Sequence, residues 1–346
     1  MRIRSNCEEM KLRKPENGVP NLLRLTHVLS GFLNLVQPPT VLQLEPTTRC
    51  NLRCKHCFRS SKTSGDMSLG LFKSIVNQLG KPKLLVKKIY LTGLGEPLLN
   101  PDVFSMVKYA KERGFEVGFT SNFTLVNETV ASNLIKSGLD HLSVSIDGAS
   151  DHTYEQIRAG SSFDEVVENV RLFVKAKAES RSRTPKLVLN AVITDLNIDE
   201  TGEIIRLGER LGVDGICLSE RIIPNKSVER KAHLASLVNE ESSGRLLDIE
   251  LAGFNNPQLP CLATRGCYVT FDGIILPCSS LAQLVPREEY HKFMLGNLSV
   301  ESFLNVWYSR DYREFRKRLI LGCCQQFCRG CPERRIRANM YARSND

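Results

Sequence analysis

The chain has 346 residues, of which 42% are hydrophobic and 25% are charged, and its formal net charge is +9. These proportions are ordinary for a globular protein, and they exclude a coiled coil and a chain that is disordered throughout. No apolar run is long enough to span a membrane, and the N-terminus lacks the apolar stretch of a secretion signal. We therefore expect a cytoplasmic protein that is large enough to bury its own core.

The 12 cysteines are too few for a disulfide scaffold, yet they are many for a cytoplasmic chain. Thiols stay reduced in the cytoplasm, where clustered cysteines more often bind metal. Three cysteines lie within eight residues and seven lie in the last quarter of the chain. Their distribution, more than their number, indicates where metals bind.

Strand-like and helix-like segments alternate from residue 41 to residue 218. We expect strands at Val41–Glu45, Lys88–Thr92, Phe115–Thr120, His141–Ile146, Leu187–Ile193 and Gly215–Leu218. We expect helices at Ser68–Leu79, Asp102–Arg113, Asn127–Ser137, Phe163–Ala178 and Asp199–Leu211. This alternation favours a parallel sheet, either doubly wound or a partial barrel, with function at the C-terminal ends of the strands.

The alternation ends near residue 220. A turn-rich stretch, Asn255–Pro260, precedes a cysteine-rich unit that contains one expected hairpin, Tyr268–Leu276, with Asp272-Gly273 at its turn. A single helix is expected at Val300–Leu321. We divide the chain into an N-terminal helical extension (1–40), a core (41–220), a connection (221–260) and a cysteine-rich unit with a basic tail (261–346).

Cys50, Cys54 and Cys57 lie in the loop that follows the first expected strand. Three thiolates in one loop can hold three irons of a cubane cluster and leave the fourth iron open. A structural zinc site requires four ligands, and His56 would be the fourth. We favour the iron–sulfur cluster, because a zinc site would not explain the motifs that follow in the later loops.

The C-x3-C-x2-C spacing and these later loops resemble the radical S-adenosylmethionine (SAM) superfamily, from about Val41 to Leu218. In that family the open iron of a [4Fe–4S] cluster binds SAM. One electron then cleaves SAM to methionine and a 5′-deoxyadenosyl radical, which abstracts a hydrogen atom from the substrate. The resemblance implies a partial (β/α)6 TIM-like barrel, an oxidoreductase or maturase activity, and an electron donor such as flavodoxin or ferredoxin.

The segment Thr92–Pro97 resembles the Gly-Gly-Glu motif that binds the SAM amino group, with Leu94 interrupting the glycines. The resemblance further implies that Arg158 pairs with the SAM carboxylate, a role that suits a guanidinium fork. Cys217 is expected to be an ordinary small apolar residue, and it becomes a candidate hydrogen-atom donor if it faces the cavity. The expected SAM contacts are Phe58, Gly93, Gly95, Glu96, Pro97, Ser121, Asn122, Ser143, Ser145, Asp147, Arg158 and Val192.

Three of these residues also have an ordinary structural interpretation. Ser143 could face away from the site, Asn122 could form a turn, and Arg158 could lie on the surface of a helix. The SAM interpretation depends on the combination of loops and not on any one of these residues.

In the cysteine-rich unit, Cys261 and Cys278 flank the hairpin, and Cys328 and Cys331 form a later C-x2-C pair. The pattern resembles the SPASM extension, or its shorter twitch form, and implies one auxiliary [4Fe–4S] cluster held by these four cysteines. Zinc at the same four thiolates is the alternative. We expect the unit to cover the barrel mouth. Other candidate ligands are Cys324 as a replacement, and Cys267 and Cys323 for a partial second cluster.

We predict that the enzyme oxidises, cross-links or epimerises a peptide or protein side chain. The alternative is a small-molecule substrate, such as a tetrapyrrole precursor, a sugar or a lipid. Forty residues precede Val41, which is fewer than the leader-binding domain of many peptide-modifying relatives needs. A non-enzymatic nucleic-acid-binding module is disfavoured, because the basic tail lacks interleaved aromatic residues.

Overall fold

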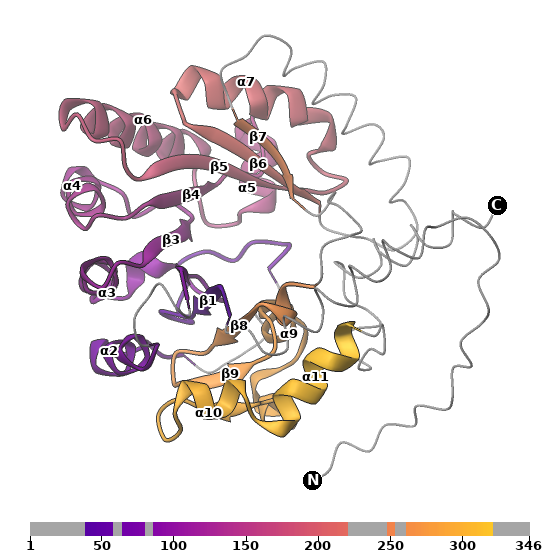
Figure 1. Cartoon of the computed structure of the whole chain (residues 1–346). Helices are drawn as coiled ribbons and strands as arrows, with labels where there is room; N and C mark the ends of the chain where they lie inside the picture. Colours follow the sequence, from indigo (N-terminus) through magenta and orange to yellow (C-terminus); the bar gives the residue numbers. More distant parts are fainter. Residues whose placement is uncertain (1–38, 58–63, 80–85, 221–247, 253–260, 321–346) are drawn as a thin grey trace, which may run out of the picture.

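The computed structural model describes residues 39–57, 64–79, 86–220, 248–252 and 261–320. These residues build a 10-stranded sheet in the order β10-β9-β8-β1-β2-β3-β4-β5-β6-β7 (Figure 1). The central strands are parallel, and β9 pairs antiparallel with both β8 and β10. The sheet is open at its edges, which confirms the expected partial barrel.

The elements match the expected alternation to within a few residues. The strands are β1 (Val41–Leu44), β2 (Lys88–Leu91), β3 (Glu116–Ser121), β4 (His141–Ser145), β5 (Lys186–Ile193), β6 (Gly215–Glu220), β7 (Asp248–Ala252), β8 (Gly266–Val269), β9 (Ile274–Leu276) and β10 (Gly296–Asn297). The helices are α2 (Leu69–Gln78), α3 (Val103–Glu112), α4 (Glu128–Lys136), α5 (Asp151–Ile157), α6 (Phe163–Glu179), α7 (Thr201–Leu211), α9 (Ser279–Leu284), α10 (Phe303–Trp307) and α11 (Arg310–Ile320).

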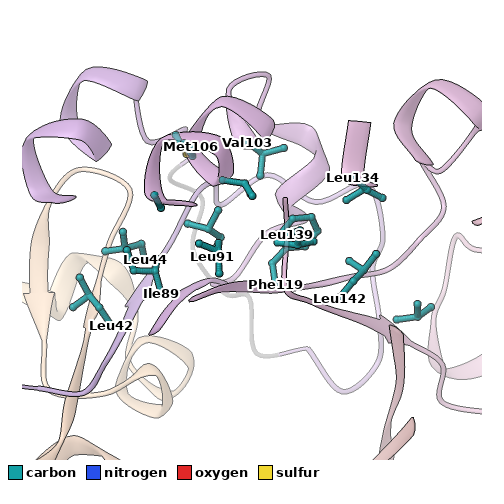
Figure 2. Packing of buried hydrophobic residues seen from close by; sticks show 14 of the residues in the cluster. Leu42, Leu44, Ile89, Leu91, Val103, Met106, Phe119, Leu134, Leu139 and Leu142 are labelled. Carbon is teal, nitrogen blue, oxygen red and sulfur yellow. The ribbon is translucent and has the colours of Figure 1, made fainter. Parts of the chain in front are cut away.

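The main hydrophobic core lies between the sheet and the helices α2, α3, α4, α6 and α7, which cover its outer face (Figure 1). Leu42, Leu44, Ile89 and Leu91 point from β1 and β2 towards these helices and are fully buried against residues such as Met106 (Figure 2). Burying one such side chain stabilises the fold by roughly 1.5–3 kcal/mol. The alternate residues of each strand therefore face the concave side of the sheet.

Local capping fixes where several helices begin and end. The side chains of Ser68, Asn127 and Ser162 accept hydrogen bonds from backbone N–H groups in the first turns of α2, α4 and α6. Gly212 ends α7 in the left-handed conformation, with φ at 68°. After this turn the chain continues into β6, which pairs in parallel with β5.

The expected single helix at Val300–Leu321 is wrong, because α10 and α11 are separate helices. The Ser302 hydroxyl accepts a hydrogen bond from the Asn305 N–H at 3.3 Å, so α10 begins after residue 302. The Ser309 hydroxyl accepts one from the Tyr312 N–H at 3.2 Å. This second N-cap interrupts the helix and starts α11.

Three further features differ from the sequence-based expectation. Helix α5 was not expected, and β7 lies within the stretch expected as a connection, where it pairs with β6. In addition, β8 of the hairpin pairs in parallel with β1 and so joins the sheet of the core. Among the residues described, no helix is long and apolar enough to cross a membrane. The expected N-terminal helix and the basic tail lie outside the described residues.

Candidate functional site

Cys50, Cys54 and Cys57 lie beyond the C-terminal end of β1, where the sequence predicts a cluster. Cys50 and Cys54 are half-buried, whereas Cys57 is exposed. Backbone N–H groups of this loop donate to the carbonyl oxygens of Ile157 and Ala159 at 2.8 and 2.9 Å. These two hydrogen bonds hold the cysteine loop against the end of α5.

The three thiols share one electrostatic environment. Burial raises the pKa of the Cys54 thiol, the charge of Arg158 lowers it, and the neighbouring Cys50 and Cys57 raise it further. The Arg158 Nη1 atom donates to the Cys54 Sγ atom at 3.9 Å, and the Asn122 Nδ2 atom donates to the Cys50 Sγ atom at 4.0 Å. Grouped thiols with nearby donors fit an iron–sulfur cluster, whose ligands are thiolates.

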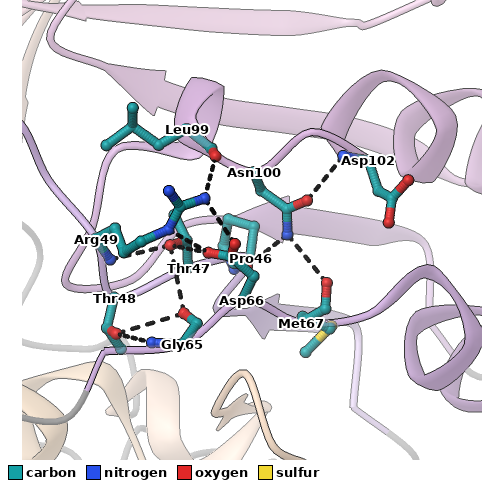
Figure 3. Close-up of polar contacts among 10 residues, drawn as sticks. All are labelled: Pro46, Thr47, Thr48, Arg49, Gly65, Asp66, Met67, Leu99, Asn100 and Asp102. Atoms are coloured by element: carbon teal, nitrogen blue, oxygen red, sulfur yellow. Dashed lines mark hydrogen bonds and ion pairs between the residues drawn. The ribbon is translucent and has the colours of Figure 1, made fainter.

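The segment that leads into this loop is held by an independent set of polar contacts (Figure 3). The Arg49 guanidinium forms an ion pair with Asp66, with an Nη2–Oδ2 distance of 2.6 Å. The buried Asn100 side chain donates to the carbonyl oxygens of Pro46 and Met67 at 2.7 and 3.0 Å. The segment between β1 and Cys50 is therefore held by two separate sets of contacts, one through Arg49 and one through Asn100.

Glu96 connects the loop that follows β2 to the end of β3 by hydrogen bonds. Its side chain is buried, and its carboxylate accepts hydrogen bonds from the Ser121 hydroxyl at 2.8 Å and the Asn122 N–H at 2.7 Å. Burial raises the pKa of Glu96, and these two hydrogen bonds oppose that increase. A Cβ atom on Gly95 would lie 2.4 Å from two backbone carbonyl oxygens, so this position admits no side chain. Pro97 is buried and begins a short 3-10 helix.

Asp147 and Arg158 form a buried ion pair at the end of β4. The Arg158 Nε atom lies 2.7 Å from the Asp147 Oδ2 atom, as an ion pair and not as an aligned hydrogen bond. The Val192 N–H donates to Asp147 Oδ1 at 2.8 Å, and the His56 Nε2 atom lies 3.5 Å from Oδ2. Burial lowers the pKa of Arg158, but the charge of Asp147 more than offsets this and raises it. Arg158 is therefore buried beside the cysteines and does not lie on a helix surface.

Other predicted residues lie on the concave face of the sheet. Ser143 and Val192 are half-buried there, because their sequence neighbours are the ones buried beneath the helices. Ser145 is buried at the end of β4 and pairs in register with Asn190, which in turn pairs with Cys217. Cys217 is half-buried and shares this face. The structure thus brings the expected SAM region and Cys217 to one side of the sheet.

Part of the expected auxiliary site lies around the start of the hairpin. Cys261 and Cys278 are half-buried, and Cys278 directly precedes α9. Cys267 is buried on β8, and burial raises the pKa of its thiol to about 12. Tyr312 on α11 interacts electrostatically with Cys267 and Cys278, and the buried Arg316 guanidinium lies beside its ring at 4.6 Å. Thiols next to a buried cation fit a group held by thiolates.

Some predicted site residues cannot be placed. Phe58, Cys324, Cys328 and Cys331 lie outside the described residues. Within the part of the chain that is described, no group of three or more His, Cys, Asp or Glu side chains is arranged so that it could hold a single metal ion. Glu45, a buried carboxylate that directly follows β1, belongs to none of the predicted site motifs.

Two protein-family models match the chain. The radical SAM superfamily model matches residues 44–208. The SPASM model, described as an iron–sulfur cluster-binding domain, matches residues 261–332.

Relatives with assigned names match most of the chain. A tungsten-containing aldehyde ferredoxin oxidoreductase cofactor-modifying protein from Pyrococcus furiosus is 28% identical, over 80% of this chain and 82% of that protein. The AdoMet-dependent heme synthase from Methanosarcina barkeri is 25% identical, over 91% of this chain and 96% of that protein. Mycofactocin maturase MftC from Mycolicibacterium smegmatis is 26% identical, over 86% and 77%.

Solved structures share the fold. SuiB from Streptococcus suis bound to SAM superposes with a TM-score of 0.66 and 18% identity, and covers 84% of this chain and 72% of that chain. Native anSMEcpe with bound AdoMet gives a TM-score of 0.64 at 18% identity, with 85% and 86% covered. The family models, the named relatives and the fold agree with the thiol cluster at the end of β1. The chain therefore belongs to the radical SAM superfamily, as a SPASM-domain enzyme that uses SAM and iron–sulfur clusters.

Proposed function

We propose that this enzyme reductively cleaves SAM and uses the resulting 5′-deoxyadenosyl radical to abstract a hydrogen atom from a peptide or protein side chain. The superfamily membership supports the radical chemistry. The observation that supports a peptide substrate is the scarcity of cations on the upper part of the concave face, in the strands that the structure describes.

Cys50, Cys54 and Cys57 would hold the cluster of the core. When bound, the cluster supplies the electron that cleaves SAM. The Arg158 guanidinium and the Asn122 amide lie beside two of these thiols, where they stabilise the thiolate form by charge and by hydrogen bonding. Glu96 holds the backbone of Asn122 in place, so the loops after β2 and β3 meet at a fixed distance from the cysteines.

The upper part of the concave face carries hydroxyl and amide groups. In the strands that the structure describes, lysines on this face lie only at the N-terminal ends of β2 and β5. A tetrapyrrole with several carboxylates requires cations for recognition, whereas a peptide backbone requires neutral donors and acceptors. The scarcity of cations here favours a substrate that is recognised by hydrogen bonds over one that carries several carboxylates. The polar residues or thiols at half-buried positions on this face include Thr120, Ser143, Asn190, Cys217 and Ser219.

A small-molecule substrate is the second candidate. It is supported by two relatives that match 80% or more of this chain, one named as a heme synthase and the other as a cofactor-modifying protein. The same radical would then act on a cofactor precursor. Flavodoxin or ferredoxin is the electron donor that we propose in either case.

Anaerobic incubation of the iron-loaded protein with SAM and dithionite tests the radical chemistry. We expect 5′-deoxyadenosine from the parent protein and from Cys217→Ala, and none from Cys54→Ala. Cys328→Ala should retain the product or reduce it less than Cys54→Ala does. A cluster-replete parent that forms no 5′-deoxyadenosine would contradict the proposal.

Deuterium transfer identifies the substrate class. Candidate peptides and small molecules with deuterated C–H positions are incubated with the enzyme, and mass spectrometry measures deuterium in 5′-deoxyadenosine. Transfer from a peptide supports the first candidate. Transfer only from a cofactor precursor replaces it with the second, and exchange of the dithionite for flavodoxin or ferredoxin tests the electron donor.

A further inference from the structure

Glu45 is a buried carboxylate at the junction between the SAM-binding loop and the SPASM region. It directly follows β1, and only 1% of its surface is exposed. Its Oε1 atom accepts hydrogen bonds from the Tyr268 hydroxyl at 2.7 Å and from the Leu94 N–H at 3.2 Å. Its Oε2 atom accepts one from the Phe271 N–H at 3.3 Å. One side chain therefore joins β8, the hairpin turn and the loop after β2.

The contact between these parts is too close to admit additional atoms. A Cβ atom on Gly93 would lie 2.5 Å from the Glu45 Cγ atom and 2.8 Å from the Tyr268 hydroxyl. Gly93 belongs to the motif expected to bind the SAM amino group. Only glycine therefore fits at position 93, because a side chain would collide with Glu45 and Tyr268 whether or not SAM is bound.

The hairpin turn is held on its other side as well. The Phe271 ring packs directly against Gly65, where a Cβ atom would lie 2.1 Å from the ring. The Arg287 guanidinium lies 4.4 Å from the centre of the same ring and forms an ion pair with Asp272 at 2.6 Å. The Phe271 N–H that reaches Glu45 is therefore held by a rigid turn.

The junction also borders the expected auxiliary cluster. A cavity of about 90 Å³ is lined by the loop after β2, by Tyr268, and by Ser279 and Gln283 of α9. Ser279 follows Cys278, an expected cluster ligand. Tyr268 packs in one hydrophobic cluster with Leu281 and Ala282 of α9, so a displacement of α9 or β8 would reach the SAM loop through Tyr268 and Glu45.

We propose that Glu45 is a positioning residue through which the SPASM region sets the affinity of the enzyme for SAM. This inference rests on the proposed function, because it takes the loop after β2 as the SAM-binding loop. Glu45 itself does not touch the reacting atoms. Because Glu45 is hydrogen-bonded to both the Tyr268 hydroxyl and the Leu94 N–H, it holds the Gly93–Leu94 backbone in a fixed position relative to β8. The loop is therefore preorganised before SAM binds.

The test compares two buried tyrosines of the same region. Tyr268→Phe removes the hydroxyl that donates to Glu45, whereas Tyr290→Phe removes a hydroxyl that donates to the Ala282 carbonyl oxygen at 2.7 Å. The dissociation constant for SAM is measured by anaerobic equilibrium dialysis on iron-loaded proteins of equal iron content. A hydrogen bond to a carboxylate is strong enough that we expect Tyr268→Phe to weaken SAM binding roughly tenfold. Tyr290→Phe should stay within about twofold of the parent.

A double-mutant cycle separates positioning from a general loss of structure. Glu45→Leu removes the acceptor of the Tyr268 hydroxyl and should weaken SAM binding. Adding Tyr268→Phe to Glu45→Leu should then cost little more, because the contact is already gone. Thermal midpoints of Tyr268→Phe and Tyr290→Phe should agree to within a few degrees. Additive effects, or parental SAM affinity in Tyr268→Phe, would overturn the inference while the proposed function stands. A parent protein that does not bind SAM would overturn both.

Discussion

The buried ion pair between Asp147 and Arg158 provides a test of the site that does not depend on turnover. The Asp147 carboxylate is fully buried, and 8% of the Arg158 side chain is exposed. The substitution Arg158→Met leaves a buried carboxylate with the Val192 N–H and the nearby His56 ring, but without its guanidinium partner. Removing one partner of a buried pair costs roughly 3–5 kcal/mol.

For a chain of this size, each kcal/mol corresponds to about 2 °C in the melting temperature. We therefore expect Arg158→Met to lower the melting temperature by roughly 6–10 °C, measured by circular dichroism at equal iron content. Arg171→Met is the matched control, because Arg171 pairs with Glu168 at the surface, with 56% and 66% of the two side chains exposed. The control should shift by no more than about 2 °C. Equal shifts in the two variants would refute the burial argument.

Three further outcomes are expected. Gly95→Ala should lower the rate of 5′-deoxyadenosine formation roughly 100-fold, because the new Cβ atom would displace the backbone that leads into the cysteine loop. Gly70→Ala is the control and should leave that rate unchanged, because its Cβ atom would lie near only the Ser68 hydroxyl, at 3.9 Å. Burial raises the pKa of Glu116, but hydrogen bonds from Lys88 and His141 outweigh this and lower it. The stabilisation is present above the ordinary carboxyl pKa and is lost as the pH falls through the lowered value, so Lys88→Met should move acid unfolding, followed by circular dichroism, to higher pH. The pair is partly exposed, so the stabilisation is below about 1 kcal/mol. Removal of iron by chelation should abolish 5′-deoxyadenosine formation and leave the helical circular dichroism signal in place, because the core consists of apolar side chains; a collapse of that signal would contradict this expectation.

The sequence predicts the sheet because local patterns determine it. Buried residues alternate strictly along β1, β2 and β5, and caps such as Asn127 and Gly212 mark the helix ends. The same local signals fail where a second cap lies inside an apolar pattern. Ser309 looks like an ordinary helix residue in the sequence, yet its hydroxyl starts α11.

The site is predictable to the extent that its residues belong to short motifs. The cysteine loop and the loop after β2 each lie within a few consecutive residues, so their spacing carries the information. Glu45 has no such motif, because its partner Tyr268 is 223 residues away in the sequence. Asp147 and Arg158 were predicted as SAM contacts, but their ion pair with each other depends on how α5 turns back toward β4.

The parallel pairing of β1 with β8 has a consequence for the synthesis of the chain. Residues 41–44 emerge from the ribosome early, but their second neighbour in the sheet, residues 266–269, is made only after most of the barrel. Until then one edge of β1 exposes unpaired backbone groups, which is the kind of edge that recruits other chains. A core that is cut after β6 would keep this open edge permanently. Expression of the barrel alone should therefore favour aggregation. In the full chain, the SPASM hairpin pairs with this edge of β1 and prevents it from pairing with other chains.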